Sequence, residues 1–287
     1  MWRVDAELVR GLIVDQFPAW QAEPIAPIEP GGWDHVSFRI GTSGLARFPR
    51  AMHYAPQVDK EQRWLPVLGA RLPLAVPEPL GRGRPGRGYP WEWSIYAWIE
   101  GNMPVDCHDV SLAEALASFL RALYALDTTD GPRPGLHNFF RGGPLAAYDG
   151  EVCDAIDRLG DRVGRVRALT VWSLALASTL EAPPVWVHGD ITPGNLLVRE
   201  GRLHAVIDFG GLAVGDPACD LTIAWTFFEG RAREAFRLAV GMDEGTWARA
   251  RGWALWKALI RLARREDPAD RRVLASILAD GSSRSRA

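Results

Sequence analysis

The feature that most constrains the fold of this chain is a polar loop held between two short apolar segments. The segment VWV at 185–187 leads into HGDITPGN, and LLV at 196–198 leaves it. Apolar runs of this length beside turn residues are typical of buried strands. After a turn at 199–202, the segment HAVI leads back to Asp208. The loop is therefore clamped at both ends, and we expect Asp208 beside Asn195 at the mouth of a hairpin.

Three polar residues of this region have the chemistry of a metal-assisted phosphoryl-transfer site. Asp190 and Asn195 are five positions apart, and Asp208 opens the sequence DFG. Mg²⁺ prefers oxygen ligands and takes one or two from a protein, which fits Asn195 with Asp208. Asp190 remains available to orient and deprotonate a hydroxyl. HGD alone occurs by chance in many proteins, so the hypothesis depends on the whole set, including GDPACD at 215–220.

Composition limits the class of partner. The chain has 287 residues and 47% hydrophobic content, enough for one large domain or two lobes. Its 33 basic and 35 acidic residues give a net charge of -2, so no basic excess indicates nucleic acid or an anionic membrane. We therefore expect a small-molecule partner. Oligomeric state is left open by the sequence.

The expected cellular location of the protein follows from features that the sequence lacks. The N-terminus lacks the residue order of a signal peptide, and the longest apolar run, 169–180, is shorter than the roughly 20 residues needed to cross a bilayer. Three widely separated cysteines, Cys107, Cys153 and Cys219, form no CxxC pair and are expected to be reduced core thiols. These features favour a cytoplasmic protein.

The first hundred residues have strand and turn patterns. SFRIG and GLARFPR are expected to form a hairpin around the turn at 41–44, followed by a helix over VDKEQRWLPVLGARL, a connector and the strand WEWSIYAWIEG. Polar residues and proline then favour a hinge at 97–105. We therefore predict an N-terminal lobe at residues 1–100 and a C-terminal lobe at 101–287.

Helical periodicity dominates after the hinge. The first helix is expected to begin at Ser111, since Ser111 and Glu114 have the capping-box spacing. Further helices are expected at 148–160, 162–181, 218–230, 231–241, 245–265 and 268–280. Short strands are expected at 185–187, 196–198 and 204–207.

The segments HGDITPGNLLV, AVIDFGG and VGDPACDL resemble the aminoglycoside phosphotransferase family of small-molecule kinases. The resemblance extends over nearly the whole chain. It implies an α+β, bilobal protein-kinase-like fold, in which an N-terminal antiparallel β-sheet lobe with a helix holds ATP or GTP. It also implies a larger, mainly helical C-terminal lobe with the catalytic loop and the acceptor site.

The resemblance implies specific roles for five residues. Asp190 would be the catalytic base, and Asn195 and Asp208 would bind Mg²⁺, as in the protein-kinase signature. His188 would support the catalytic loop. Asp220 would support it as well, through hydrogen bonds to its backbone.

Candidate nucleotide-binding residues lie in the first hundred positions. Gly31 and Gly32 precede a strand, as expected of a loop folding over phosphates, although a plain surface turn is the alternative. Arg47 stands on the third strand where the resembling pattern has lysine, and arginine is a bulkier, planar donor. Glu61 falls where the family has its helix glutamate, so we infer an Arg47 to Glu61 pair. The alternative is a solvated Glu61 beside Lys60.

The segment YAWIEG resembles the chain that links the two lobes in this family. Main-chain groups around Trp98 and Ile99 are therefore expected to bind the nucleotide base. This pattern does not distinguish ATP from GTP.

The resulting hypothesis is a Mg²⁺-dependent phosphotransferase that moves the γ-phosphoryl group of ATP or GTP to a small-molecule hydroxyl. An aminoglycoside or related antibiotic is one acceptor; a sugar, choline or amino alcohol is the alternative. Arg47 motivates a second alternative, an inactive nucleotide-binding regulator. A protein kinase is disfavoured because few residues separate DFGG from GDPACD.

Acidic side chains in the helical lobe are candidates for contacts with a polycationic acceptor, but exposed helix charge is the more common role of such residues. They are Asp154, Asp157, Glu229, Glu266 and Asp267. HNFFRGG at 137–143 is an unusual loop to which the sequence assigns no role beyond positioning by Arg141.

Overall fold

Alternating apolar residues near the N-terminus form an antiparallel sheet in the order β1-β2-β3-β5-β4. The computed structural model describes residues 3–29 and 31–280. The five strands are β1 (Ile25–Pro27), β2 (His35–Ile40), β3 (Gly44–Pro49), β4 (Pro79–Gly83) and β5 (Trp93–Ala97). β2 and β3 form the predicted hairpin, with Ile40 opposite Gly44.

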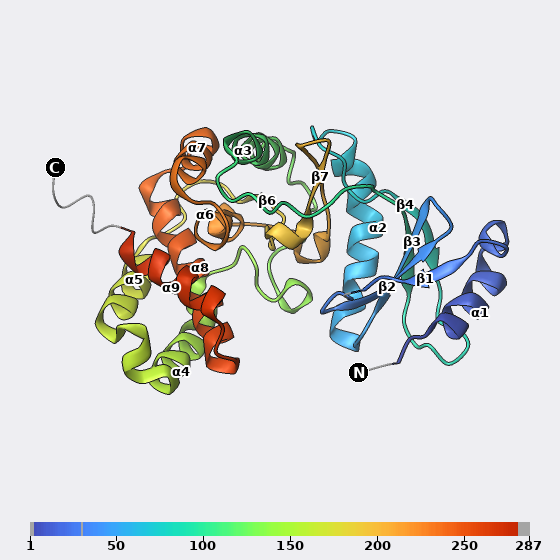
Figure 1. The fold of residues 1–287 in the computed structure, drawn as a ribbon, viewed down its shortest axis with the longest axis horizontal. Helices are drawn as coiled ribbons and strands as arrows, with labels where there is room; N and C mark the ends of the chain where they lie inside the picture. Colours follow the sequence, from blue (N-terminus) through green and yellow to red (C-terminus); the bar gives the residue numbers. More distant parts are fainter. Residues whose placement is uncertain (1–2, 30, 281–287) are drawn as a thin grey trace.

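Two helices cover opposite faces of this sheet (Figure 1). α1 (Ala6–Gln16) packs Val9, Leu12 and Ile13 against Phe48 and its neighbours in a small separate core. On the other face, α2 (Pro56–Gly69) lies between the sheet and the helical lobe. Because side chains alternate along a strand, β3 directs Arg47 to the face opposite Phe48, which is the face that α2 covers.

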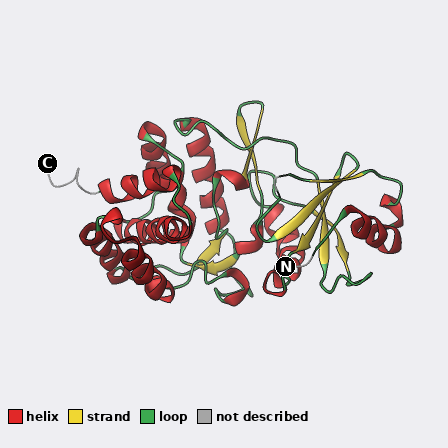
Figure 2. Ribbon diagram, turned by 60° about the horizontal axis from the view of Figure 1, so that its bottom comes forward, coloured by secondary structure: helices red, strands yellow, loops and turns green. Residues whose placement is uncertain are grey.

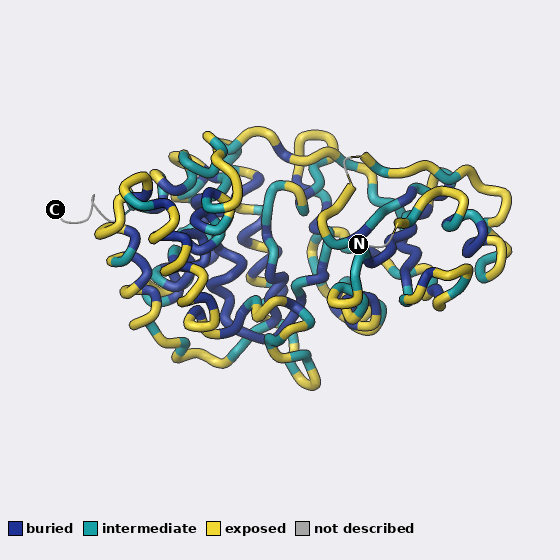
Figure 3. The backbone as a smooth tube through the Cα atoms, turned by 90° about the horizontal axis from the view of Figure 1, so that it is seen from below, coloured by how far each residue is buried: buried dark blue, intermediate teal, exposed yellow. Residues whose placement is uncertain are grey.

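The rest of the chain forms the larger helical lobe, and Figure 2 separates it clearly from the sheet. Its helices are α3 (Val110–Tyr124), α4 (Asp149–Leu159), α5 (Arg165–Ala177), α6 (Ile223–Thr226), α7 (Gly230–Val240), α8 (Glu244–Arg264) and α9 (Pro268–Ala279). Buried backbone runs through the interior of both lobes (Figure 3). The predicted α+β organisation is confirmed.

Two small antiparallel sheets of two strands each lie in the C-terminal lobe. β6 (Val185–Val187) pairs with β9 (Ala213–Gly215), and β7 (Leu196–Arg199) pairs with β8 (Arg202–Val206). Asn102 exchanges backbone hydrogen bonds with Val198, and Ala75 bonds to the backbone of β8. The lobe boundary predicted at residue 100 falls in the segment between β5 and α3, where we propose to keep it.

Several elements differ from the sequence-based expectations. α3 begins earlier than Ser111, because Asp109 is the N-cap and accepts the backbone N–H of Leu112 at 3.0 Å. The helix expected at 218–230 is a 3₁₀ segment (Pro217–Thr222) followed by the short α6. Of the three cysteines, only Cys219 is buried, while Cys153 is exposed.

The edge strand β4 lies in the segment expected to be a connector because of its proline and glycine content. A Cβ at Gly83 would lie 2.0 Å from Trp93, and one at Gly81 would lie 2.6 Å from Phe17. Glycine is therefore needed for aromatic rings to pack on the backbone, and an edge strand tolerates it. α1 was also missed. No helix within the described residues is long and apolar enough to span a membrane.

Candidate active site

The loop 188–195, which the sequence predicts to be catalytic, is held by one buried carboxylate behind it. Asp220 accepts the backbone N–H of His188 at 2.9 Å and that of Gly189 at 2.7 Å. Gly189 has φ +83°, and a Cβ there would lie 2.5 Å from the carbonyl oxygen of Gly211, so only glycine fits. The residues predicted to support the loop, Asp220 and His188, are thus in direct contact.

His188 is fully buried and joins two strand ends. Its Nδ1 lies 3.2 Å from the backbone nitrogen of Asp190, and its Nε2 lies 3.1 Å from the carbonyl oxygen of Ile207. The backbone N–H of Asp190 needs a ring nitrogen without a hydrogen as its acceptor, and the Ile207 carbonyl needs a ring N–H as its donor. The ring hydrogen is therefore assigned to Nε2. The ring therefore connects Asp190 to the residue before Asp208.

Asp190 lies between an amide and an ammonium group. The Asn195 Nδ2 donates to the backbone oxygen of Asp190 at 2.8 Å and lies 3.3 Å from its Oδ2. The Nζ of Lys257, on α8, lies 2.6 Å from Oδ1. Loss of water around the carboxylate would raise its pKa, but Lys257 more than offsets this effect and lowers the pKa of Asp190 to about 2. Asp190 is therefore ionised at neutral pH.

Asn195 and Asp208 lie at adjoining ends of the β7–β8 hairpin, where the backbone N–H of Ile207 donates to the carbonyl of Asn195 at 2.9 Å. Because the Asn195 amide nitrogen faces Asp190, its carboxamide oxygen is the atom left for a cation. Asp208 adopts a left-handed backbone with φ +66°, an uncommon conformation that often occurs at functional sites. This set of oxygen donors fits Mg²⁺.

Arg47 lies at the junction of the two lobes. Its Nη2 donates to Asp208 Oδ1 at 2.9 Å, and its Nη1 lies 3.5 Å from Glu61 Oε1. Glu61 also accepts the Tyr96 hydroxyl at 2.5 Å. Glu61 is 2% exposed, so the alternative of a solvated carboxylate is wrong. Burial would lower the pKa of Arg47, but the carboxylates of Asp208 and Glu61 raise it.

The other residues predicted to bind the nucleotide make fewer contacts that bear on this role. Gly31 and Gly32 precede β2, and Arg50 donates to the Gly32 carbonyl at 3.0 Å. The backbone N–H of Trp98 already donates to Ser43 at 2.8 Å. A nucleotide base would therefore have the Trp98 carbonyl and the Ile99 backbone as candidate partners.

Both lysines of the chain lie in this region, and sequence reasoning missed them. Lys60 Nζ donates to the Gly210 carbonyl at 2.6 Å. Burial outweighs the attraction of Glu61 and Asp208 and lowers the pKa of Lys60 to about 8. Burial also lowers the pKa of Lys257, with Asp190 opposing the shift. The signal was available, because the other basic residues are arginines and these two positions are exceptions.

The loop 137–143 packs on the segment that follows Asp208. Asn138 donates to the carbonyls of Arg141 at 2.9 Å and Gly211 at 3.1 Å, while the Gly142 carbonyl accepts the N–H of Asp216 at 2.7 Å. Phe139 and Phe140 both have positive φ, 54° and 55°. Two consecutive bulky residues in this conformation indicate a strained loop that its surroundings hold in place.

The acidic candidates for acceptor binding make other contacts. Asp157 pairs with Arg165, Glu266 pairs with Arg271, and Asp267 caps α9. Asp154 and Glu229 are exposed. None of the five contacts Asp190 among the hydrogen bonds and ion pairs of the described residues.

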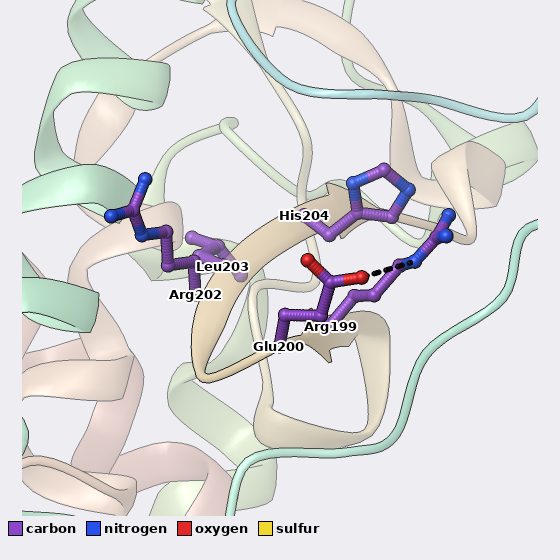
Figure 4. A pocket seen from close by; sticks show the side chains of 5 residues that line it. All are labelled: Arg199, Glu200, Arg202, Leu203 and His204. Atoms are coloured by element: carbon purple, nitrogen blue, oxygen red, sulfur yellow. Dashed lines mark ion pairs between the residues drawn. The ribbon is translucent and has the colours of Figure 1, made fainter.

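A surface hollow beside the β7–β8 turn is a poor alternative site. Figure 4 shows that Arg199, Glu200, Arg202, Leu203 and His204 line it, with an ion pair between the first two. Asp190, Asn195 and Asp208 do not line it. The chemistry described above is therefore located elsewhere.

Known proteins share both the sequence pattern and the fold. Residues 25–253 match the sequence model of the phosphotransferase enzyme family. A curated aminoglycoside 3'-phosphotransferase from Escherichia coli is 29% identical over 119 residues, 41% of this chain and 44% of the relative. The match thus spans less than half of the relative's length.

Two solved structures illustrate the shared fold. The GDP and kanamycin complex of APH(2")-IIia has a TM-score of 0.74 at 19% identity, covering 96% of this chain and 98% of that one. The apoenzyme of macrolide 2'-phosphotransferase MphH from Brachybacterium faecium has a TM-score of 0.62 at 20% identity, covering 96% and 98%. At these identities the likeness establishes the protein-kinase-like, bilobal fold.

Proposed function

Because the chain belongs to the phosphotransferase enzyme family, we propose that it transfers the γ-phosphoryl group of ATP or GTP to a hydroxyl of a small molecule. The observation that carries this proposal is the convergence of an ionised Asp190 with the oxygen donors of Asn195 and Asp208. The nucleotide complex of a relative with the same fold adds support.

Each residue has a role that its surroundings suit. Asp190 would accept a hydrogen bond from the acceptor hydroxyl and take its proton. Since its pKa is about 2, it is a weak base, and we expect its main contribution to be orientation with late proton transfer. Asn195 and Asp208 would hold Mg²⁺, which when bound neutralises charge on the phosphates.

The nucleotide side is proposed to depend on Arg47. Its guanidinium is held between Glu61 and Asp208, at the face of the sheet that points to the catalytic loop. We assign it the phosphate-holding role that lysine has in the family, with Glu61 orienting it. Gly31 and Gly32 would cover the phosphates, and the backbone at Trp98 and Ile99 would contact the base. His188 and Asp220 would keep the loop in place.

The acceptor has two candidate classes. The curated relative is an aminoglycoside 3'-phosphotransferase, which supports an antibiotic acceptor. A metabolite such as a sugar, choline or an amino alcohol is the second class. It is favoured because Asp157, Glu266 and Asp267 pair with arginines or cap a helix and do not contact Asp190. An inactive regulator is disfavoured by the complete set Asp190, Asn195 and Asp208.

The test is phosphoryl transfer from Mg²⁺-ATP and Mg²⁺-GTP to a panel of hydroxylated antibiotics and metabolites. Asp190→Asn should lower kcat by about 10²- to 10⁴-fold, the usual contribution of a positioned base. Asp154→Asn, the same change at an exposed helix position, should leave kcat unchanged. Equal rates for Asp190→Asn and the parent would disprove the assignment. Nucleotide binding without transfer to any acceptor would favour the regulator.

A further inference from the structure

A group of three possible metal ligands lies outside the proposed active site, where the segment before α3 meets the start of α7. Cys107 and His108 belong to the segment between β5 and α3, and Glu229 immediately precedes α7. The Cys107 Sγ, a ring nitrogen of His108 and a carboxylate oxygen of Glu229 all lie within 4.8 Å of one another. A thiol, an imidazole and a carboxylate therefore surround one small volume.

The backbone brings these residues together from distant parts of the sequence. The N–H of Glu229 donates to the Cys107 carbonyl at 3.0 Å. The N–H of His108 donates to Asp106 Oδ1 at 2.9 Å, which fixes the turn before α3. α3 and α7 pack side by side behind the group (Figure 1). The backbone positions of the three residues are thus set by helix packing, and only their side chains need to adjust to a ligand.

The three side chains are not committed to strong contacts elsewhere. Glu229 is the N-cap residue of α7, yet its side chain makes no capping hydrogen bond. Its Oε2 lies 3.9 Å from the His108 Nε2, and both side chains are more than 60% exposed. A pair of this kind contributes little stability by itself. Cys107 is a free thiol. A cation could therefore take all three groups without breaking a stable interaction.

The ligand types distinguish between cations. Zn²⁺ binds thiolate sulfur, imidazole nitrogen and carboxylate oxygen at about 2.0 to 2.3 Å, so ligand atoms around a tetrahedral ion are about 3.3 to 3.8 Å apart. The separations here are at most 4.8 Å, so side-chain movements of about 1 Å would complete the geometry. Mg²⁺ and Ca²⁺ prefer oxygen ligands and gain little from a thiolate. A water molecule would take the fourth position.

The charges of the group also suit a divalent cation. Cys107 would bind as a thiolate and release its proton to solvent, so the thiolate and Glu229 together carry two negative charges. The charge of Glu229 also acts on Arg233. The guanidinium of Arg233, however, donates to the Phe228 carbonyl at 3.0 Å and to Ser276 Oγ at 2.9 Å. The carboxylate oxygens of Glu229 are therefore left to a metal ion.

We propose that Cys107, His108 and Glu229 form a binding site for a thiophilic divalent cation, for which Zn²⁺ is the best match. The bound ion ties the segment before α3 to the start of α7. Because it binds the folded arrangement of two distant segments, it stabilises the folded protein. The site goes beyond the proposed function and does not depend on it, since Asn195 and Asp208 supply none of its ligands.

The experiment is a calorimetric titration of the full chain with Zn²⁺ in a chelator-free, reducing buffer. Excess Mg²⁺ is present, so that the oxygen ligands proposed for Mg²⁺ are already occupied. We expect one Zn²⁺ to bind per chain. Loss of a residue that only orients a ligand costs about 10- to 100-fold in affinity, so Cys107→Ser should weaken binding by at least about 100-fold. Glu229→Gln should weaken it by at least about 10-fold, because a neutral amide oxygen is the poorer ligand.

Matched controls remove the same groups elsewhere. Cys153→Ser removes the exposed thiol of α4, and Glu234→Gln removes an exposed carboxylate of α7. Both variants, and Asp208→Asn, should bind Zn²⁺ as tightly as the parent. Absence of Zn²⁺ binding to the parent would overturn the proposal. So would an affinity for Cys107→Ser equal to that of the parent, because the ion would then be bound at another place.

Two further measurements identify the ligand and its effect. Co²⁺ in place of Zn²⁺ should give the near-ultraviolet absorption band of a thiolate ligand in the parent and in Cys153→Ser, but not in Cys107→Ser. Zn²⁺ should raise the Tm of the parent and leave that of Cys107→Ser unchanged, while equal Tm values without metal show that the variant is folded. A missing thiolate band in the parent, or an equal Tm rise in Cys107→Ser, would contradict the assignment. None of these results depends on phosphoryl transfer.

Discussion

At the scale of single residues, the position of each charged side chain matters more in this site than a match to the family's residue type. Arg47 stands where the family pattern has lysine, yet it contacts Glu61 and Asp208 at once. Of the two lysines that the chain contains, Lys60 is buried and donates to the Gly210 carbonyl, and Lys257 is half-buried and pairs with Asp190.

Lys60 should make the stability of the protein depend on pH. Its pKa is lowered from 10.5 to about 8, so the charged form is disfavoured in the folded state. The full cost is present below pH 8. Between about pH 8 and 10.5 the unfolded chain binds more protons, and the free energy of unfolding should rise by up to about 3 kcal/mol from this group.

Urea unfolding of the parent and of Lys60→Met from pH 7 to 10 measures this contribution. The difference between the two free energies of unfolding should change with pH, with the parent gaining on the variant above pH 8. Other titrating groups affect both proteins equally and cancel. Parallel pH curves would show that Lys60 is not shifted.

At the scale of elements, the helical lobe supplies the rigid support behind the site. α5 packs against α8, which carries Lys257, and the two helices meet closely at Gly252. A Cβ on Gly252 would lie 2.5 Å from the Cβ of Ala175 and 3.0 Å from Leu145 Cδ1. The small residue therefore determines how near α8 lies to its neighbours.

Gly252→Ala should destabilise the protein by about 1 to 3 kcal/mol, because a methyl group is inserted into a packed helix contact. Gly150→Ala is the matched control, since a Cβ there has nothing within 4 Å. That change should leave stability unchanged or raise it by up to about 1 kcal/mol through helix propensity. Denaturant unfolding measures both. Similar effects of the two substitutions would contradict the packing argument.

At the scale of the whole molecule, a few contacts couple the sheet lobe to the helical lobe around Asp208. They include the ion pair of Arg47 with Asp208, the hydrogen bond of Lys60 to Gly210, and the backbone hydrogen bonds of Ala75 to β8. A nucleotide held across these contacts would bind the folded protein only. Its binding should therefore stabilise both lobes together.

Thermal unfolding with increasing Mg²⁺-nucleotide tests this coupling. At about 100 times Kd, the stabilisation should be near 2.7 kcal/mol for a ligand that binds only the folded state. Arg47→Met should lose most of the shift, and Arg47→Lys should keep part of it because a cation remains. A shift for Arg47→Met as large as that of the parent would remove Arg47 from the nucleotide site.

The sequence alone predicted the polar loop at 188–195 and its two flanking strands, while the bilobal fold was expected from the family resemblance. The clamped loop, the hairpin after it and the positions of Asp190, Asn195 and Asp208 follow from short-range pattern, because apolar strands and turn residues are local signals. Most helices of the C-terminal lobe were also predicted close to their observed bounds.

Only the tertiary structure decided which distant side chains complete the site. Lys257 lies 67 positions after Asp190, and Lys60 lies 150 positions before Gly210, so no local pattern relates them. The same holds for β4, whose glycines are explained by rings packed against them from Phe17 and Trp93. Hydrophobic periodicity in the sequence indicates which face of a helix or strand is apolar. Long-range packing determines which charged side chains come into contact, and it places Lys257 against Asp190.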